Sequence, residues 1–252
     1  MLEKICTLAR HTGNEIIKFY NSKKIINISY KLDKTPITNV DREAHNIIKK
    51  GLFKIDSKLP VISEEELHPF KICRLWKDYW LIDPLDGTKE FLKKNSEFTV
   101  NISLIKNGVP TLGVIYAPVL NVLYFSSNKN AWKETGSGKK EKIYVASDKN
   151  QRNTLLVTSR SHPDKELSNF LKKIKNYQLK KMGSSLKFCL IAEGTAQIYP
   201  RFGSTHIWDT AAGQAILIAA GGKVQTWSGD DLNYSLYSRS SFINPGFCAF
   251  AP

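Results

Sequence analysis

The 252-residue sequence has little sulfur and no long apolar run. It contains four cysteines and two methionines, and no apolar stretch reaches the ~18 residues that a membrane-spanning helix needs. The start of the chain lacks a basic segment followed by an apolar one, which argues against a signal peptide. The cysteines are scattered with no Cys-x-x-Cys pair, which argues against a zinc site, a redox motif or a secreted disulfide framework. We therefore expect a cytoplasmic protein whose thiols are reduced: Cys6, Cys73, Cys189 and Cys248.

Acidic residues are scarce relative to basic ones, with 23 Asp and Glu against 37 Lys and Arg and a formal net charge of +14. The 42% hydrophobic and 24% charged residues exclude a disordered or low-complexity chain. A basic balance fits nucleic acid, an acidic membrane surface or phosphorylated metabolites equally well. Because the lysines are dispersed in short clusters, the sequence favours a solvated lysine-rich surface over a dedicated polyanion site.

The first part of the chain has the pattern of two helices followed by a sheet. Apolar residues at helical spacing predict a helix through Tyr20. A second helix is expected to begin near Thr38, which with Asp41 resembles a capping box. Short apolar or alternating runs then predict strands that form mostly meanders. These runs are residues 61–62, 79–82, 98–104, 112–116 and 122–125.

The second part of the chain has alternating strand and helix patterns, which favour an α/β arrangement packed on the α+β first part. A polar segment, residues 127–142, with a turn expected around Gly136-Ser137-Gly138, is predicted to approach a domain boundary. We thus expect an α+β half, residues 1–150, and an α/β half, residues 151–252. The predicted elements of the second half are strands at 154–158, near 177 and at 196–199, and helices at 163–174, 185–193 and 210–220.

The segment with the most chemical information is Asp83-Pro84-Leu85-Asp86-Gly87-Thr88. An apolar strand precedes it, and its proline and glycine fix a sharply shaped strand end that presents two carboxylates together. Rigid carboxylate and carbonyl oxygens suit an octahedral Mg²⁺ that keeps other positions for water and phosphate. A plain turn is the alternative, because Asp-Pro and Asp-Gly are common turn formers.

Three other acidic side chains lie where they could join such a site. Glu64 follows the strand at 61–62, Asp209 stands at the start of a very apolar helix, and Asp41 occupies the acidic position of the capping box. A solvated acidic turn at Glu64 and ordinary helix caps at Asp41 and Asp209 are the alternatives. Spacing alone does not show that these residues converge.

Three ordered motifs make the sequence resemble the lithium-sensitive, Mg²⁺-dependent phosphatase superfamily that contains inositol monophosphatase and fructose 1,6-bisphosphatase. They are Glu-Glu after a strand, Asp-Pro-Leu-Asp-Gly-Thr, and Trp-Asp-Thr-Ala-Ala-Gly at 208–213. Lys89-Glu90-Phe91 follows the second motif where inositol monophosphatases usually show Thr-Asn-Phe, so the sequence looks more like the bacterial 3'(2'),5'-bisphosphate nucleotidases. Residues 183–189 and 199–202 add to that likeness.

The resemblance implies a layered αβαβα sandwich and a set of metal ligands. Glu64, Asp83 and the Leu85 carbonyl would hold one Mg²⁺, and Asp83, Asp86 and Asp209 a second. Glu64 would help a weaker third ion through water. The family precedent has Thr88 and Asp41 bonded to each other and orienting the attacking water, with Glu64 as the other candidate to steer or deprotonate it. Paired cations promote such an in-line attack without a phosphoenzyme. The first half would thus be the metal-binding and catalytic half, and the second half would complete the metal site and the nucleotide pocket.

The expected nucleotide pocket uses residues of the second half. Gly183-Ser184-Ser185 opens the predicted helix that carries Lys187, so hydroxyl, N–H and ammonium groups can face an anion together. An ordinary serine cap with an exposed lysine is the alternative. The resemblance points to Ser184, Lys187 and Arg201 around the adenosine and 5'-phosphate, with His162 as a further contact or a surface histidine. The full set of substrate-binding residues that we expect from the resemblance is Glu64, Leu85, Asp86, Gly87, Thr88, His162, Gly183, Ser184, Ser185, Lys187, Arg201 and Asp209.

The resemblance implies hydrolysis of the 3'-phosphate of 3'-phosphoadenosine 5'-phosphate to AMP and phosphate, in sulphur metabolism, with inhibition by Li⁺ and acceptance of the sulphated relative. An inositol monophosphatase or broad sugar phosphatase is the alternative within enzymes. A basic protein that binds nucleic acid or membrane is the alternative outside them. Because an acidic metal site argues against nucleic acid, we expect a small-molecule nucleotide as the partner, possible peripheral contact with an acidic membrane surface, and a monomer or weak dimer.

Overall fold

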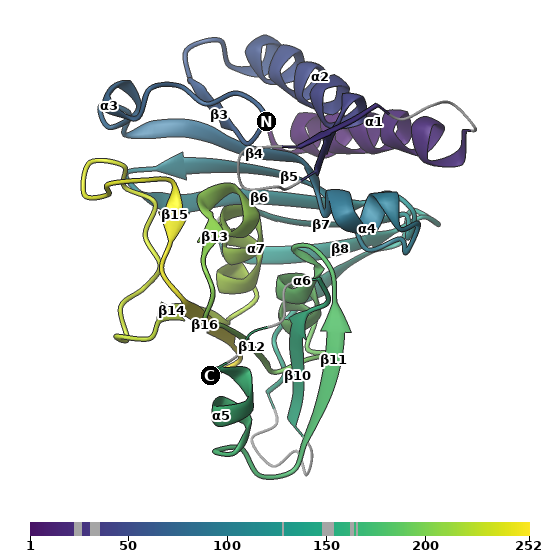
Figure 1. Ribbon diagram of the computed structural model, residues 1–252. Coiled ribbons are helices and arrows are strands. Elements are labelled where there is room, and N and C mark those ends of the chain that lie inside the picture. Colours follow the sequence, from purple (N-terminus) through teal and green to yellow (C-terminus); the bar gives the residue numbers. More distant parts are fainter. Residues whose placement is uncertain (23–26, 31–35, 128, 148–153, 162–163, 165) are drawn as a thin grey trace.

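The computed structural model describes residues 1–22, 27–30, 36–127, 129–147, 154–161, 164 and 166–252, which form five alternating layers of helix and sheet (Figure 1). Helices α1 (Leu2–Asn21) and α2 (Asn39–Ile55) cover one face of a seven-stranded sheet. Helices α6 (Leu186–Ala192) and α7 (Ile207–Ala219) lie between that sheet and a five-stranded one. Helix α5 (Leu167–Leu171) forms the last layer. The layered architecture expected from the sequence is confirmed.

The seven-stranded sheet is a meander to which one parallel strand has been added. Strands β4 to β9 pair antiparallel in chain order, and β3 pairs parallel with β4. The predicted meander is therefore confirmed. The strands are β3 (Val61–Ser63), β4 (Asp78–Asp86), β5 (Thr99–Lys106), β6 (Val109–Ala117), β7 (Val122–Ser127), β8 (Asn130–Thr135) and β9 (Lys140–Ile143).

The segment 127–142, expected as a polar approach to a domain boundary, supplies β8 and β9, two strands that the sequence did not predict, and the boundary itself stays a prediction. Ala131 and Ile143 are buried, and the rings of Phe125 and Trp132 lie beside the ammonium of Lys140. Long lysine stems cover the apolar rings in this hairpin, so its sequence looks more polar than its packing is. The predicted turn does connect the two strands, with Gly138 at a φ of 79°.

Strand β4 is buried on both faces, which explains the unbroken apolar run at residues 79–82. Trp80 and Ile82 belong to the core formed with α1 and α2, whereas Tyr79 and Leu81 belong to the core that includes α7. Because side chains alternate along a strand, this strand is clamped between two helical layers. Its C-terminal end, which carries the acidic motif, is thereby held rigidly.

The five-stranded sheet has the order β11-β10-β12-β16-β14 and mixes parallel and antiparallel pairs. Strands β11, β10 and β12 are parallel, which agrees with the α/β arrangement predicted for this half, whereas β16 pairs antiparallel with both β12 and β14. The sequence did not predict β14 or β16. The strands are β10 (Thr154–Ser159), β11 (Tyr177–Met182), β12 (Ile198–Arg201), β14 (Lys223–Thr226) and β16 (Phe247–Phe250).

Short elements complete the fold. They are two antiparallel pairs, two helices and their connections: β1 (Ile28–Tyr30) with β2 (Pro36–Thr38), β13 (Thr205–His206) with β15 (Ile243–Asn244), α3 (Phe70–Cys73) and α4 (Thr88–Leu92). All four cysteines lie in the described residues and are free thiols. Among the described helices, none is both long and apolar enough to cross a membrane.

Two predicted helices differ from the observed ones. The helix expected at 163–174 is reduced to α5, which buries none of its residues fully, so little tertiary packing is available to stabilise a longer helix. Residues 163 and 165 of that prediction lie outside the described residues. Helix α7 begins at Ile207 rather than at residue 210, so Asp209 lies within its first turn.

Candidate active site

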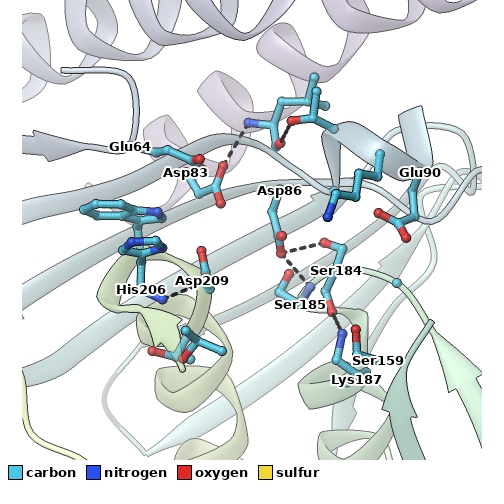
Figure 2. Close-up of a pocket in the computed structure, with 18 of the residues that line it drawn as sticks. Glu64, Asp83, Asp86, Glu90, Ser159, Ser184, Ser185, Lys187, His206 and Asp209 are labelled. Atoms are coloured by element: carbon cyan, nitrogen blue, oxygen red, sulfur yellow. Dashed lines mark hydrogen bonds between the residues drawn. The ribbon is translucent and has the colours of Figure 1, made fainter. Parts of the chain in front are cut away.

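A cavity of about 910 Å³ opens between the two sheets, and the acidic motif of β4 lies in its wall (Figure 2). The ends of β4 and β12, helix α4, the first turns of α6 and α7, and the loops beside them line it. Most of the residues that the sequence singled out line this cavity: Glu64, Asp83, Leu85, Asp86, Gly87, Thr88, Gly183, Ser184, Ser185, Lys187, Arg201 and Asp209. The sequence signals therefore converge in space.

Three carboxylates form a tight cluster in the cavity wall. The parallel register of β3 and β4 pairs Ser63 with Ile82, so the residues that follow, Glu64 and Asp83, lie side by side. Asp209 reaches the same place from the first turn of α7 (Figure 2). One oxygen from each of the three carboxylates lies within 4.8 Å of the others. Carboxylates this close favour a bound cation, because hard divalent ions prefer such oxygen sets.

The electrostatics of the cluster also fit a cation. Burial raises the pKa of Asp83 well above its ordinary value, and the charges of Glu64 and Asp86 add to the rise. Burial likewise raises the pKa of Asp209, with the charges of Asp86 and Glu64 as the next causes. Without positive charge these groups repel one another in a medium of low polarity. A divalent cation would remove that penalty, so the residues present fit the metal that the sequence predicts.

Asp86 lies beside this cluster and is held by a separate set of hydrogen bonds. Its Oδ2 accepts from the Ser184 hydroxyl and the Ser185 amide, each at 2.7 Å, and from the Asn101 side-chain amide at 3.2 Å. Burial raises its pKa, while the charge of Lys187 and these hydrogen bonds oppose the rise. Carboxylate oxygens of Glu64, Asp83 and Asp209 thus lie within 4.8 Å of one another. The carboxylate of Asp86 instead points toward Ser184 and Ser185.

Asp41 and Thr88 are in contact where the N-terminal ends of α2 and α4 lie next to each other. Asp41 completes the predicted capping box, because its Oδ2 accepts from the amide of Thr38 at 2.8 Å and from its hydroxyl at 2.5 Å. Its Oδ1 accepts from the Thr88 hydroxyl at 2.9 Å. Gly87, with a φ of 94°, makes the left-handed turn that aims Thr88 at Asp41. Burial raises the pKa of Asp41, and the bonds from Thr38 and Thr88 oppose that rise.

Sequence reasoning missed a polar network on β5 that supports Asp86. The antiparallel register pairs Asp86 with Thr99 and Asp83 with Asn101. The Thr99 hydroxyl donates to the side-chain oxygen Oδ1 of Asn101 at 2.9 Å, and the Ser185 hydroxyl donates to the same oxygen at 2.9 Å. A signal was available, because Thr99, Asn101 and Ser103 alternate with apolar residues in a strand that is buried on both faces.

Lys187 is buried, with 5% of its surface exposed, so the alternative of an exposed lysine was wrong. The side chain of Ser185, the residue before α6, makes no capping bond either. The Lys187 ammonium donates to the Ser184 carbonyl and, at 3.3 Å, to the Met182 carbonyl, and it lies 5.2 Å from the centre of the Tyr199 ring. Burial lowers the pKa of Lys187 to about 8, and the charge of Asp86 opposes the fall.

The remaining candidates have different outcomes. Arg201 lines the cavity and donates to the Ser204 carbonyl at 3.1 Å. His162 lies outside the described residues. His206 is a cavity residue that the sequence did not indicate: its amide donates to Oδ2 of Asp209 at 2.8 Å, and its ring stacks on Trp208. Asp209 therefore caps its helix through one oxygen while it belongs to the carboxylate cluster.

Comparison with known proteins agrees with this geometry. Residues 1–245 match the inositol monophosphatase family. The chain is 68% identical over 251 residues to a 3'(2'),5'-bisphosphate nucleotidase CysQ of Buchnera aphidicola subsp. Acyrthosiphon pisum, covering 100% of this chain and 94% of that relative. It is 49% identical over 247 residues to the CysQ of Escherichia coli K12, covering 98% of each. The crystal structure of a Bacteroides thetaiotaomicron CysQ superposes with a TM-score of 0.84 at 38% identity, covering 97% of this chain and 94% of that one.

Proposed function

The chain belongs to the inositol monophosphatase family, and we propose that it removes the 3'-phosphate of 3'-phosphoadenosine 5'-phosphate to give AMP and phosphate in sulphur metabolism. Full-length relatives at up to 68% identity bear the name 3'(2'),5'-bisphosphate nucleotidase. The observation that carries the proposal is the cavity in which a three-carboxylate cluster and a buried lysine stand on opposite sides of Asp86. Such a cavity can take a phosphate ester at one end and a second anion at the other.

The metal-binding residues of the proposal are those that the resemblance to the family implies. Glu64, Asp83 and the Leu85 carbonyl would hold one Mg²⁺, and Asp83, Asp86 and Asp209 another, with Glu64 assisting a third. When bound, such ions screen the phosphate charge and make water more acidic. The buried cluster of Glu64, Asp83 and Asp209 and the raised pKa values of both aspartates support cation binding.

The protein's own contribution to the attack would come from Asp41 and Thr88. The Thr88 hydroxyl donates a hydrogen bond of 2.9 Å to Asp41, so its oxygen has lone pairs left to accept a hydrogen bond from a water in the cavity. Asp41 is itself fixed by Thr38 and cannot turn away. This pair would hold the attacking water in one orientation, which is the positional part of general base catalysis. Glu64 would be the other group that steers or deprotonates it.

The nucleotide would extend from the carboxylate cluster toward α6. Ser184, Lys187 and Arg201 line that part of the cavity, and their hydroxyl and cationic groups suit the 5'-phosphate and adenosine. The backbone of Gly87 and Thr88, which lies next to Asp86, would contact the 3'-phosphate. His162 stays a prediction for a further contact. The sulphated relative of the substrate differs only beyond the 5'-phosphate, so we expect the same residues to accept it.

Inositol 1-phosphate is the alternative substrate, because other members of the family are named for it. Glu90, part of the Lys89-Glu90-Phe91 sequence that favours the nucleotidase branch, lines the cavity beside Gly87. Phosphate release from 3'-phosphoadenosine 5'-phosphate and from inositol 1-phosphate, each with and without Mg²⁺ and Li⁺, separates the two. We expect selective, Mg²⁺-dependent and Li⁺-sensitive turnover of the nucleotide. Preference for the inositol ester would overturn the roles of Ser184, Lys187 and Arg201.

The charge of +14 supports a second property, peripheral attachment to an acidic membrane surface at the cytoplasmic face. Dispersed lysines would bind anionic lipid weakly and lose it as salt rises. Sedimentation with vesicles of anionic and of neutral lipid tests this. We expect binding to the anionic vesicles at low salt that falls steeply with added salt, and no binding at low salt would refute it.

A further inference from the structure

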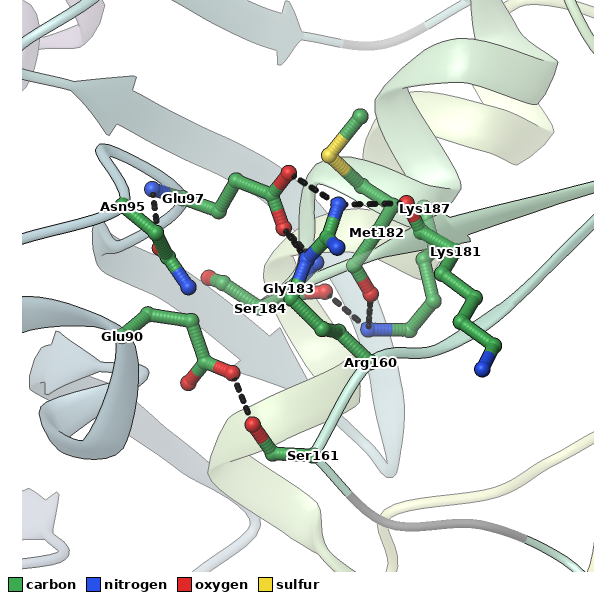
Figure 3. Close-up of polar contacts among 10 residues, drawn as sticks. All are labelled: Glu90, Asn95, Glu97, Arg160, Ser161, Lys181, Met182, Gly183, Ser184 and Lys187. Carbon is green, nitrogen blue, oxygen red and sulfur yellow. Dashed lines mark hydrogen bonds and ion pairs between the residues drawn. The ribbon is translucent and has the colours of Figure 1, made fainter. Parts of the chain in front are cut away.

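The turn between α4 and β5 is joined to the loops that follow β10 and β11 by a compact set of polar contacts (Figure 3). The carboxylate of Glu97 accepts both from Nε and from a terminal nitrogen of Arg160, each at 2.7 Å. The same carboxylate accepts from the Gly183 amide at 2.7 Å. Arg160 and Gly183, which follow Glu97 by 63 and 86 positions in the sequence, are thus both hydrogen-bonded to its side chain. We refer to Glu97, Arg160 and Gly183 as the latch.

The latch is well ordered by its surroundings. Glu97 is only 16% exposed, and its amide donates to the Asn95 side chain at 3.1 Å. Arg160 also donates to the Lys181 carbonyl at 3.0 Å, so its guanidinium spans the turn and β11. These contacts commit Arg160 to the latch rather than to a ligand in the cavity. A bidentate pair between arginine and carboxylate is stronger and more specific in geometry than an ordinary surface ion pair.

Gly183 is held against the turn by close contact as well as by its hydrogen bond. A Cβ at this position would lie 2.7 Å from Cγ of Glu90 and 2.8 Å from the Glu97 carbonyl oxygen. Only glycine lets the loop approach so closely. The next residue, Ser184, has a φ of 56°, a left-handed conformation that non-glycine residues adopt only where the surroundings impose it.

The residues that follow Gly183 in the sequence belong to the proposed nucleotide pocket. The Ser184 hydroxyl donates to Asp86, and the Ser184 carbonyl accepts from the Lys187 ammonium. The position of Gly183 therefore determines where the hydroxyl of Ser184 and the ammonium of Lys187 lie. Asp86 is less dependent on the latch, because Asn101 of β5 also donates to it.

We propose that Glu97 is a positioning residue for the nucleotide side of the cavity. Its carboxylate fixes Gly183 by accepting a hydrogen bond from the Gly183 amide, and it is itself held by Arg160. This inference rests on the proposed nucleotidase function. It predicts that loss of the latch weakens nucleotide binding while the hydrolysis of a small phosphate ester, which needs only the carboxylate side, changes little.

The test compares Glu97→Ala, Glu97→Gln and Arg160→Ala with wild type. The probe is AMP, whose calorimetric affinity does not depend on turnover, and p-nitrophenyl phosphate serves as the small ester. We expect Glu97→Ala to weaken AMP binding roughly tenfold, the size of one lost charge-assisted hydrogen bond, with kcat/KM for the ester within about twofold. Glu97→Gln should lie between, because a neutral oxygen still accepts from Gly183, and Arg160→Ala should be milder than Glu97→Ala.

A matched control is the Arg10–Glu134 ion pair, which joins α1 to β8 away from the cavity and whose side chains are also partly exposed. Glu134→Gln should leave AMP affinity unchanged. Hydrogen exchange of the peptide that spans residues 183–185 should be faster in Glu97→Ala and not in Glu134→Gln. Unchanged AMP affinity in Glu97→Ala, or an equal loss in Glu134→Gln, would overturn the proposal.

Failure of the proposed function gives a different pattern. Wild-type protein that neither binds AMP nor hydrolyses 3'-phosphoadenosine 5'-phosphate would refute the function. The exchange measurement would then test by itself whether Glu97 holds Gly183 in place. Faster hydrogen exchange at residues 183–185 in Glu97→Ala supports that role, and unchanged exchange refutes it.

Discussion

The hydroxyl of Thr88 donates a hydrogen bond of 2.9 Å to Oδ1 of Asp41, which precedes it by 47 positions in the sequence. The other oxygen of Asp41 caps α2 through Thr38. One carboxylate thus fixes a helix end and orients a hydroxyl in the cavity wall. The capping role and the chemical role that the sequence left as alternatives are compatible.

The first prediction concerns this pair. Thr88→Val keeps the shape of the side chain but removes the hydroxyl, so we expect kcat to fall by about 10² or more, the usual share of a group that orients a proton transfer. KM should change little, because the group acts on the water. Thr88→Ser, which keeps the hydroxyl, should retain most of the activity. Steady-state kinetics with the nucleotide check this, and near-normal kcat in Thr88→Val would remove Thr88 from the reaction.

Local patterns predicted the elements that hold this pair. Helices α1 and α2, the capping box at Thr38 and the meander depend on residues close in sequence, and their periodicity marks them clearly. Strands β8 and β9 were missed because the ammonium groups of two lysines lie over the ring of Trp132, so a partly buried ring stands in a polar sequence. The division into halves near residue 150 remains a prediction.

The acidic site was visible because several of its carboxylates follow strand or helix patterns. What brings Glu64 beside Asp83 is the parallel register of β3 and β4, a long-range relation that propensities do not encode. The resemblance to a family supplied it instead. The burial of Lys187 could not be predicted from the sequence. A lysine near the start of a helix is expected to be exposed, and only the fold shows that this one is buried.

The second prediction concerns Asp83, the most buried carboxylate of the cluster. Asp83→Asn keeps an oxygen that can accept from the Leu85 amide, so the fold should persist, but it removes the negative charge that a cation needs. We expect turnover to be abolished. Calorimetric Mg²⁺ binding should weaken in parallel, and turnover close to that of wild type would refute the ligand assignment.

The third prediction is a pH dependence of stability in the absence of divalent cations. The pKa values of Asp83 and Asp209 are raised in the folded chain, whereas in the unfolded chain they are about 4. The folded state therefore binds more protons, so its advantage is complete below that value and is lost as pH rises through the raised pKa values. We expect Tm in EDTA to fall as pH rises above about 4.

Two comparisons identify the cause of that pH effect. Mg²⁺ should raise Tm more at the higher pH, because a ligand that binds only the folded state stabilises it. Asp83→Asn, with one charge fewer, should show a shallower fall of Tm in EDTA. Thermal unfolding followed by circular dichroism measures both, and a Tm that is independent of pH and of Mg²⁺ would contradict the account of the cluster.

The fourth prediction concerns Asn101, which the sequence did not single out. Its side-chain nitrogen Nδ2 donates to Asp86, and its side-chain oxygen Oδ1 accepts from the hydroxyls of Thr99 and Ser185. Asn101→Leu removes all three contacts, so Asp86 should lose part of its orientation and kcat should fall roughly tenfold. The Mg²⁺ concentration for half-maximal activity should rise. Ser103→Ala on the same strand, whose hydroxyl donates to the Leu81 carbonyl at 3.0 Å, is the control and should leave both quantities near wild type.

The fifth prediction uses the buried ammonium of Lys187, whose pKa burial lowers to about 8. Because the charged form of a base is lost as pH rises through its pKa, the positive charge beside the proposed 5'-phosphate site is present below about pH 8 and absent above it. The phosphate itself, with a second pKa near 6, is mostly in its doubly charged form from about pH 7 upward. KM for the nucleotide should therefore rise between about pH 7 and pH 9, while KM for p-nitrophenyl phosphate should stay nearly constant.

Lys187→Met and Lys187→Arg separate the charge from its titration. The methionine side chain has no charge at any pH, so in Lys187→Met the KM for the nucleotide should be high, by roughly tenfold, and flat across the range. Arginine stays protonated, so in Lys187→Arg the KM should also be flat, whatever its level. A rise of KM with pH that persists in either variant would show that another group titrates. Equal effects on nucleotide and ester would place Lys187 outside the nucleotide site and leave it a structural support for the Ser184 carbonyl.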